Sequence, residues 1–137
     1  MSRNPSLTFF LALAKTNAVL SRRFDAGLGG LGFGEFAILW HLSQADGHKL
    51  RRIDLAEKIG LTASGVTRML LPMEKIGLVK REANPLDARV SYVLIARGGK
   101  QKLEEALERT ETLFDDITGP SAGKRLDSAT ALLEDLI

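Results

Sequence analysis

The pattern of hydrophobic and polar positions predicts a mainly helical chain with one small β-hairpin. Apolar residues recur at three- and four-residue steps, the period of a helix, over 6–25, 35–42, 52–59, 62–74, 100–117 and 126–137. A short run at 78–81 and a stronger one at 90–95, rich in β-branched residues, predict two strands. We therefore expect the order α-α-α-α-β-β-α-α within a single domain covering residues 1–137.

Glycine and proline mark the connections between these elements. Residues 27–34 read GLGGLGFG, which contains the letters G-x-G-x-x-G of a dinucleotide fingerprint. That fingerprint needs a strand before it, whereas here a helix precedes it, so we interpret the segment as a loose turn between two helices. Asn84-Pro85-Leu86-Asp87 is a turn signal inside a charged loop of about eight residues, long for a hairpin. Pro72 falls late in its helix and should bend it.

The composition removes several classes of protein. The chain has no cysteine, which excludes a disulfide scaffold, a zinc–thiolate site and a thiol switch. Every apolar run is far shorter than the ~20 residues of a membrane span, and we expect no secretory signal. We therefore expect a cytoplasmic protein without a membrane partner.

Charge is distributed unevenly along the chain. Residues 47–97 carry ten basic and five acidic side chains, a net charge of +5, whereas residues 98–137 carry a net charge of −4. Such asymmetry is expected when one part of a protein faces a polyanion, although a small chain can also show it by chance.

Groups that carry catalysis are sparse. The two histidines, His41 and His48, stand seven residues apart, without the spacing of paired metal ligands. Trp40 lies close to Phe36 and Leu39, and we expect it in the hydrophobic core rather than as a stacking platform. We therefore expect no catalytic site, metal or cofactor, and a small enzyme is the least favoured class of function.

Residues 52–74 have the pattern of a helix-turn-helix. Gly60 provides the turn, and Leu61 should fix the angle between the two helices. Apolar side chains of the two helices should face each other: Leu55, Ala56 and Ile59 from the first, Val66, Met69 and Leu70 from the second. The second helix then presents short polar groups and one guanidinium, which suit base edges in a major groove: Thr62, Ser64, Gly65, Thr67 and Arg68. Helix capping would explain Thr62, but not Ser64, Thr67 and Arg68 together.

Four short sequence fragments follow one another in this region. They are L-A-E-x-x-G-L at 55–61, S-x-V-T-R at 64–68, M-E-K-x-G-L-V-x-R at 73–81 and D-x-R at 87–89. With these fragments, the run from Arg52 to Arg89 resembles the winged helix-turn-helix of the MarR family of bacterial transcription regulators. The resemblance extends over nearly the whole chain in helix order and length. It implies a winged helix-turn-helix lobe at 33–95 and a helical dimerisation lobe at 5–26 and 97–137.

The resemblance also implies roles for particular side chains. The helix beginning at Thr62 would read the major groove, and the wing from 80 to 90 would reach the adjacent minor groove with Arg89 as its probe. Asp87 would orient Arg89 by a charge-assisted hydrogen bond. The less favoured alternative is a plain surface ion pair. Phosphate contacts would come from Lys49, Arg52 and Arg81.

The implied function is that of a sequence-specific DNA-binding regulator, in the first place a repressor. It would bind a near-palindromic operator as a homodimer, built from the first helix and the last two. The helix at 6–25 and the stripe at 103–117 carry more apolar surface than one winged lobe covers. Members of this family often sense small aromatic acids, so a ligand in the crevice between the lobes would relieve binding. The alternative is a winged helix that binds an acidic partner protein, a surface for which a large apolar anchor would be expected.

The chain departs from the family pattern in three places. Leu94-Ile95 replaces the usual Leu-Thr, which removes a helix cap before the fifth helix. Pro72 stands where a helix former is usual. The glycine-rich turn at 27–34 is unusually loose, and it acts either as a hinge or only as a link.

Overall fold

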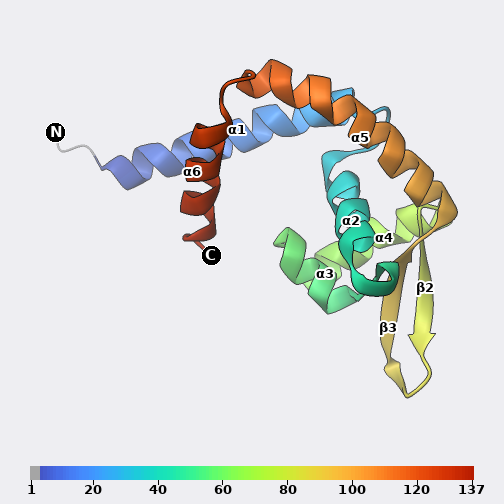
Figure 1. Ribbon diagram of the computed structural model, residues 1–137. Coiled ribbons are helices and arrows are strands. Elements are labelled where there is room, and N and C mark those ends of the chain that lie inside the picture. Colours follow the sequence, from blue (N-terminus) through green and yellow to red (C-terminus); the bar gives the residue numbers. More distant parts are fainter. Residues whose placement is uncertain (1–3) are drawn as a thin grey trace.

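The computed structural model describes residues 4–137, whose elements form two lobes (Figure 1). The helical lobe contains α1 (Pro5–Gly27), α5 (Arg97–Thr118) and α6 (Gly123–Glu134), and α1 contacts α5. The winged lobe contains α2 (Phe33–Gln44), α3 (Arg52–Ile59), α4 (Ala63–Lys75) and a small sheet. From this lobe, strands β2 (Val79–Asn84) and β3 (Asp87–Ile95) project as a wing. The predicted mainly helical fold with a small β-structure is confirmed.

A third strand, β1 (Lys49–Arg51), follows a short 3-10 turn, η1 (Asp46–His48). It pairs antiparallel with β3, with Leu50 opposite Val93, and gives the sheet the order β1-β3-β2. The expectation of a two-stranded ribbon is therefore wrong. Three residues are too few to show the alternation that reveals a strand in a sequence.

The wing is a tight hairpin rather than the long open loop that we expected. Asn84 pairs with Asp87, so only Pro85 and Leu86 connect the two strands, and the side chain of Asn84 accepts the N–H of Leu86 at 2.8 Å. The irregular part lies instead within β3. The next pair is Ala83 with Ser91, which leaves residues 88–90 as a bulge without partners on β2. The turn signal was correct, but the polar residues around it belong to exposed strands.

The helix-turn-helix forms at the predicted residues. α3 spans the expected 52–59, and Gly60 ends it in a left-handed backbone conformation, with φ of +72°, which suits glycine. Thr62 caps α4 by accepting the N–H of Gly65 at 3.1 Å. α4 continues past Pro72 to Lys75, so the proline does not end the helix. It does remove the N–H that the carbonyl group of Arg68 would otherwise accept.

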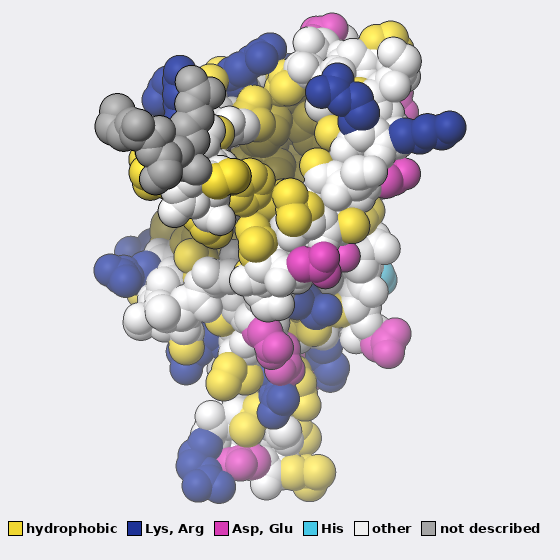
Figure 2. All heavy atoms as spheres, turned by 90° about the vertical axis from the view of Figure 1, so that its left-hand side faces the viewer, with side chains coloured by type: hydrophobic (Ala, Val, Ile, Leu, Met, Phe, Trp, Pro, Cys, Tyr) yellow, Lys and Arg dark blue, Asp and Glu magenta, His cyan; other side chains and the backbone are white. Residues whose placement is uncertain are grey.

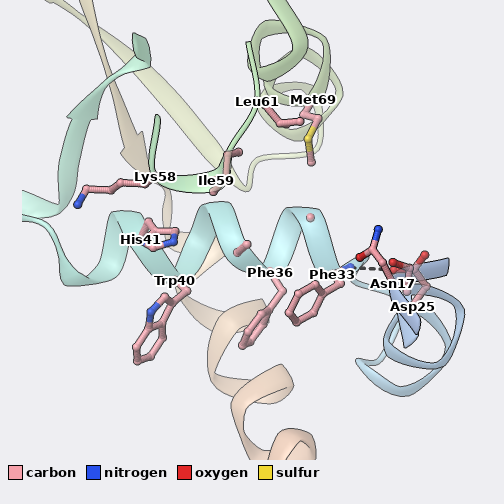
Figure 3. Close-up of a pocket in the computed structure, with 13 residues that line it drawn as sticks. Asn17, Asp25, Phe33, Phe36, Trp40, His41, Lys58, Ile59, Leu61 and Met69 are labelled. Atoms are coloured by element: carbon pink, nitrogen blue, oxygen red, sulfur yellow. Dashed lines mark hydrogen bonds between the residues drawn. The ribbon is translucent and has the colours of Figure 1, made fainter. Parts of the chain in front are cut away.

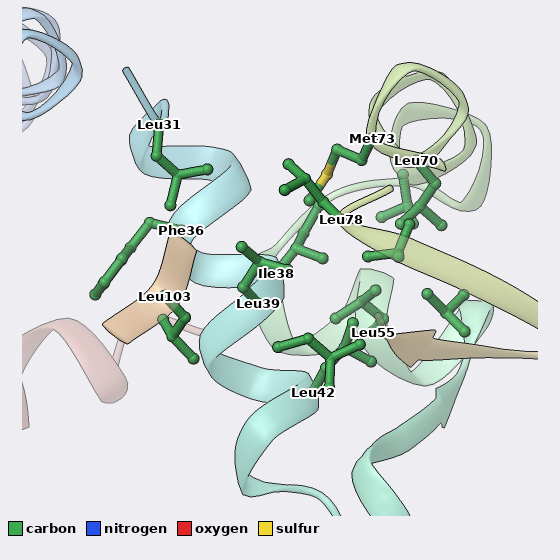
Figure 4. Packing of buried hydrophobic residues seen from close by; sticks show 14 of the residues in the cluster. Leu31, Phe36, Ile38, Leu39, Leu42, Leu55, Leu70, Met73, Leu78 and Leu103 are labelled. Carbon is green, nitrogen blue, oxygen red and sulfur yellow. The ribbon is translucent and has the colours of Figure 1, made fainter. Parts of the chain in front are cut away.

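α2 is the central helix of the hydrophobic core (Figure 4). Its own buried side chains, Ile38, Leu39 and Leu42, pack against buried side chains of α3, α4, β2 and β3: Leu55, Ala56, Val66, Leu70, Met73, Val79 and Val93. The helical lobe joins this core through Leu103 of α5. Near Gly99, α5 passes so close to the preceding chain that a Cβ at this position would overlap the carbonyl oxygen of Leu78. The predicted contact between α3 and α4 is present, because Leu55 and Ala56 share this core with Val66 and Leu70. Ile59 and Met69, also expected in this contact, are only partly buried.

Two side chains that we expected to pack inside the lobe lie at its surface. Trp40 is 39% exposed and Leu61 is 43% exposed. α2 is apolar around most of its circumference, so its sequence alone does not show which side the core covers. The side that carries Trp40 faces a cleft, described below, and Leu61 lines the same cleft.

The turn between α1 and α2 is anchored, which corrects the expectation of a loose segment. Leu28 and Leu31 are only 2% and 3% exposed, because both side chains enter the core. A carboxylate oxygen of Asp25 accepts the N–H of Phe33 at 2.8 Å, and Glu35 accepts the N–H of Gly32 at 2.8 Å. The glycines suggested freedom, whereas the leucines between them fix the turn.

The start of α5 has the weak cap that the sequence indicates. The residue before the helix is Ala96, whose methyl side chain accepts no hydrogen bond. Ile95 is the last residue of β3 and is buried in the core, so a threonine there would not occupy the capping position. The absence of a side-chain cap therefore depends on Ala96, not on Ile95.

The helical lobe leaves much apolar surface uncovered. Every residue of α1 and α6 is at least partly exposed. The exposed large side chains of this lobe are Leu7, Phe10, Leu11, Leu13 and Val19 of α1, with Leu126, Leu132, Leu133, Leu136 and Ile137 at the C-terminal end. Figure 2 shows hydrophobic side chains gathered around a hollow at this end of the molecule. The excess apolar surface expected on the first helix is thus present. The apolar stripe at 103–117 differs from the expectation, because Leu103 and Ala106 of α5 are buried in the core.

Candidate nucleic-acid interface

The outer face of α4 presents the side chains that we expect to read DNA. Ser64 and Arg68 are exposed on this face, and Thr67 is half-buried. The hydroxyl group of Thr67 donates to the carbonyl oxygen of Ala63 at 2.9 Å, and the hydroxyl oxygen of Ser64 lies 3.2 Å from that of Thr62. The first turn of the helix is therefore ordered by its own polar groups, and Arg68 projects as its only guanidinium.

Gly65 serves the helix cap. Its N–H is the group that Thr62 accepts, and a Cβ at this position would lie 3.2 Å from the hydroxyl oxygen of Thr62, tighter than most contacts. A side chain here would thus press on the cap. Sequence reasoning placed Gly65 among the DNA-binding residues, and the structure gives it this local role as well.

Asp87 fixes Arg89 in the bulge of the wing. One carboxylate oxygen of Asp87 accepts the backbone N–H of Arg89 at 3.0 Å and its Nε–H at 3.2 Å, while the second oxygen lies 3.4 Å from a terminal guanidinium nitrogen. These hydrogen bonds hold the pKa of the Asp87 carboxyl below its usual value of 3.8. A lowered pKa means that the carboxylate stays charged as the pH falls, until the pH passes below that lowered value. The Arg89 side chain is nevertheless 92% exposed, so it remains available to a ligand.

Two adjoining shallow depressions connect α4 with the wing. Arg52, Ser64, Thr67 and Arg68 line the first, together with Ala63. The second is lined by Arg51, Ile53, Arg89, Val90 and Ser91, and it shares Arg52 and Ala63 with the first. The start of α3, the outer face of α4 and residues 89–91 of the wing therefore form one continuous basic surface.

Arg51 belongs to this surface, although sequence reasoning did not select it. Its Nε donates to Asp54 at 2.8 Å, which raises the pKa of Arg51 and lowers that of Asp54. The available signal was its place beside Arg52, within the basic run that begins at Lys49. We overlooked it because β1, which positions Arg51 beside the wing, was not predicted.

The structure places two predicted phosphate ligands outside the depressions. Lys49 lies 3.2 Å from Glu82 and over the ring of Tyr92, and Nε of Arg81 lies 3.1 Å from Glu74. Exposed ion pairs of this kind are worth about 0–1 kcal/mol, so a phosphate group can replace the carboxylate. Both side chains stay candidates, but each would have to leave its present partner.

A cleft of about 710 Å³ separates α1 from the winged lobe (Figure 3). Its apolar wall comes from α2, through Phe33, Phe36 and Trp40, and continues with Ile59, Leu61 and Met69. Polar groups stand at its edges: Asn17, Ser21 and Asp25 on α1, with His41 and Lys58 on the winged lobe. Partial burial, and then the nearby charge of Lys58, lower the pKa of His41. This cleft lies where the sequence interpretation placed a crevice between the lobes.

Two kinds of feature are absent from residues 4–137. Across those residues, histidine and carboxylate side chains form no group able to hold a metal ion. No helix in the same range is long and apolar enough to cross a bilayer.

A short helix-turn-helix, a paired wing and a continuous basic surface define a winged-helix protein of the DNA-binding class. Residues 34–91 match the model of the MarR family. The HTH-type transcriptional repressor YetL of Bacillus subtilis is 34% identical over 135 residues, which cover 96% of this chain and 80% of YetL. The chain belongs to the MarR family of transcriptional regulators, and this membership places it among regulators rather than enzymes.

Solved structures show the same fold. A mutant MarR from E. coli complexed with operator DNA superposes with a TM-score of 0.84 at 19% identity, covering 98% of this chain and 96% of that one. The PcaV transcriptional regulator from Streptomyces coelicolor, in complex with its natural ligand, gives 0.84 at 17% identity and covers 99% and 96%. Other curated HTH-type regulators match over only 53% to 62% of their own length.

Proposed function

We propose that this chain binds a near-palindromic operator as a homodimer and represses transcription from it. The observation that carries the proposal is the continuous basic surface, on which Arg52, Arg68 and Arg89 come from three different elements. α4 would lie in the major groove, with the wing in the minor groove beside it. A narrow minor groove concentrates negative potential, which favours an exposed guanidinium such as that of Arg89. The name of YetL, a repressor, supports repression as the outcome.

The uncovered helical lobe supports the homodimer. Large apolar side chains of α1 and α6 are exposed in the single chain, and exposed apolar patches mark sites of association. A two-fold axis through this lobe would carry two copies of α4 to successive major grooves, about 34–36 Å apart. A dimer bound in this way would repress by blocking access of RNA polymerase to the promoter.

Selection of bound sequences from random DNA duplexes tests this proposal. We expect the full chain to enrich an inverted repeat, with half-site centres about 10–10.5 base pairs apart. Enrichment of a single unrepeated site would contradict the two-fold arrangement. If the protein bound the whole pool without enrichment at moderate salt, sequence-specific regulation would be refuted.

Replacing Arg89 by alanine is expected to weaken the salt dependence of binding. Each cationic contact with DNA displaces counterions, so the slope of log K against log salt should become less steep by about one unit for each copy of Arg89. The slope is measured by fluorescence anisotropy on the selected operator between low and moderate salt. Lys124→Ala, which removes a charge from α6, is the matched control and should leave the slope unchanged. A slope that Arg89→Ala does not alter would count against the role of the wing.

A small aromatic acid in the cleft would relieve repression. Phe33, Phe36 and Trp40 offer an apolar wall, and Lys58 offers a cation for a carboxylate. Because the cleft lies between α1 and the winged lobe, a ligand there can favour one spacing of the two α4 helices over another. The structure of PcaV, which has the same fold, holds its natural ligand, and this supports a ligand for the present chain.

Trp40, the only tryptophan of the chain, allows a direct test of this ligand. Benzoate should quench its fluorescence with saturation and release labelled operator at the same concentrations. Lys58→Ala should weaken the benzoate effect, and the uncharged analogue benzamide should bind less well than benzoate to the unaltered chain. Quenching that rises linearly without saturation would show that the cleft has no site for this class of molecule.

A further inference from the structure

One apolar side chain stands in the middle of the outer face of α4. Leu71 is 48% exposed, and it follows Ser64, Thr67 and Arg68 at the spacing i, i+3, i+4 and i+7. Seven residues are almost two helical turns, so Leu71 lies on the same side of the helix as Ser64. This spacing is the one by which a helix in the major groove presents successive side chains to base edges. The core-facing leucine of the same helix, Leu70, is buried beside it.

The other groups on this face leave Leu71 a distinct task. The hydroxyl groups of Ser64 and Thr67 already have hydrogen-bonding partners, and the cations on this side of α4 are Arg68 and, one turn beyond Leu71, Lys75. A leucine offers DNA neither a donor nor an acceptor. If it were pressed against a polar base edge, it would remove water from that edge without replacing the lost hydrogen bonds. Its favourable partner in a major groove is the C5 methyl group of thymine, the apolar group displayed there.

We propose that Leu71 contacts the C5 methyl group of one thymine in each half-site. This inference rests on the proposed function, because it requires α4 to lie in the major groove. Leu71 follows Arg68 by three positions, which corresponds to a rise of about 4.5 Å along the helix. Successive base pairs are about 3.4 Å apart. The thymine therefore lies one or two base pairs from the base that Arg68 contacts.

Replacing thymine by deoxyuridine tests this contact, since the exchange removes the methyl group and keeps the hydrogen-bonding edge. The selected operator is synthesised with deoxyuridine at one thymine position of both half-sites at a time, and its affinity for the full chain is measured by fluorescence anisotropy. At one position, we expect affinity to fall about fourfold per half-site, the factor that corresponds to burying one methyl group. At the other thymines the change should be small.

Two variants assign the effect to Leu71. Leu71→Ala should bind the thymine and deoxyuridine operators with equal affinity at that position, because the side chain that touches the methyl group is gone. Ile76→Ala is the matched control. Ile76 is also aliphatic and is 68% exposed, but it follows the end of α4, so its variant should keep the fourfold preference.

The outcomes separate this inference from the proposed function. If the selection yields an inverted repeat but every deoxyuridine operator binds as well as its parent, the proposed function stands and the role of Leu71 is refuted. The same conclusion follows if Leu71→Ala retains the full preference for thymine, since another side chain then reads the methyl group. If the selection enriches no sequence, both the operator and the role of Leu71 are overturned.

Discussion

Replacing Arg68 by alanine is expected to remove much of the preference of this protein for its operator over random DNA. The Arg68 guanidinium is exposed on the outer face of α4, where it can form a bidentate contact with guanine. Such a contact contributes about 1–3 kcal/mol of discrimination, so a dimer with two copies should lose about 2–6 kcal/mol. Competition of a scrambled duplex against the labelled operator, at one fixed salt concentration, measures this ratio.

The comparison between duplexes decides how Arg68 acts. A base contact lowers affinity for the operator far more than for the scrambled duplex, whereas a phosphate contact lowers both equally. Equal losses would therefore disprove base reading by Arg68. Lys124→Ala again removes one charge and should preserve the ratio. Because Arg68 is exposed, its replacement should change the free energy of unfolding by no more than about 0.5 kcal/mol.

Replacing Leu11 by glutamate is expected to separate the dimer and abolish operator binding at nanomolar protein concentration. Leu11 is 63% exposed on α1, within the apolar patch that we assign to the subunit interface. Each copy would forfeit about 1.5–3 kcal/mol of hydrophobic burial, so the dimer loses about 3–6 kcal/mol before the cost of burying two carboxylates. Sedimentation velocity measures the oligomeric state, and anisotropy measures binding to the operator.

The same experiment shows whether the loss is due to assembly or to unfolding. Since Leu11 is exposed in the single chain, the helical content measured by circular dichroism should be retained. Ile76→Glu places the same charge on an exposed aliphatic position outside the helical lobe, and that variant should stay dimeric. A Leu11→Glu protein that sediments as a dimer would refute the assignment of this patch to the interface.

The helix-turn-helix could be predicted from the sequence because its signals are local. Gly60 ends one helix and Thr62 caps the next, and both act on residues within one turn of themselves. The contact between Asp87 and Arg89 was likewise predictable, since the two residues are only two positions apart in the sequence. Hydrogen bonds of this range depend little on the rest of the fold, so the residue pattern is enough to reveal them.

The features that escaped prediction depend on distant parts of the chain. β1 exists because β3 lies beside it, although more than forty residues separate Lys49 from its partner Leu94. Trp40 is exposed because the core covers only one side of an almost wholly apolar helix. Leu28 and Leu31 are buried by the tertiary fold, although their glycine neighbours suggested a free segment. For the same reason, the sequence did not show that Arg51 joins the basic surface.

Because of the bulge in β3, the direction of the Arg89 side chain does not depend on the strand register of the sheet. In a regular strand, side chains alternate between faces, so a redirected residue would require a shift of the whole register. Arg89 stands where the ladder is interrupted, and the carboxylate of Asp87 sets its direction instead. If the wing enters the minor groove as proposed, substitutions at position 87 would redirect the Arg89 guanidinium toward the DNA without changing the pairing of the strands.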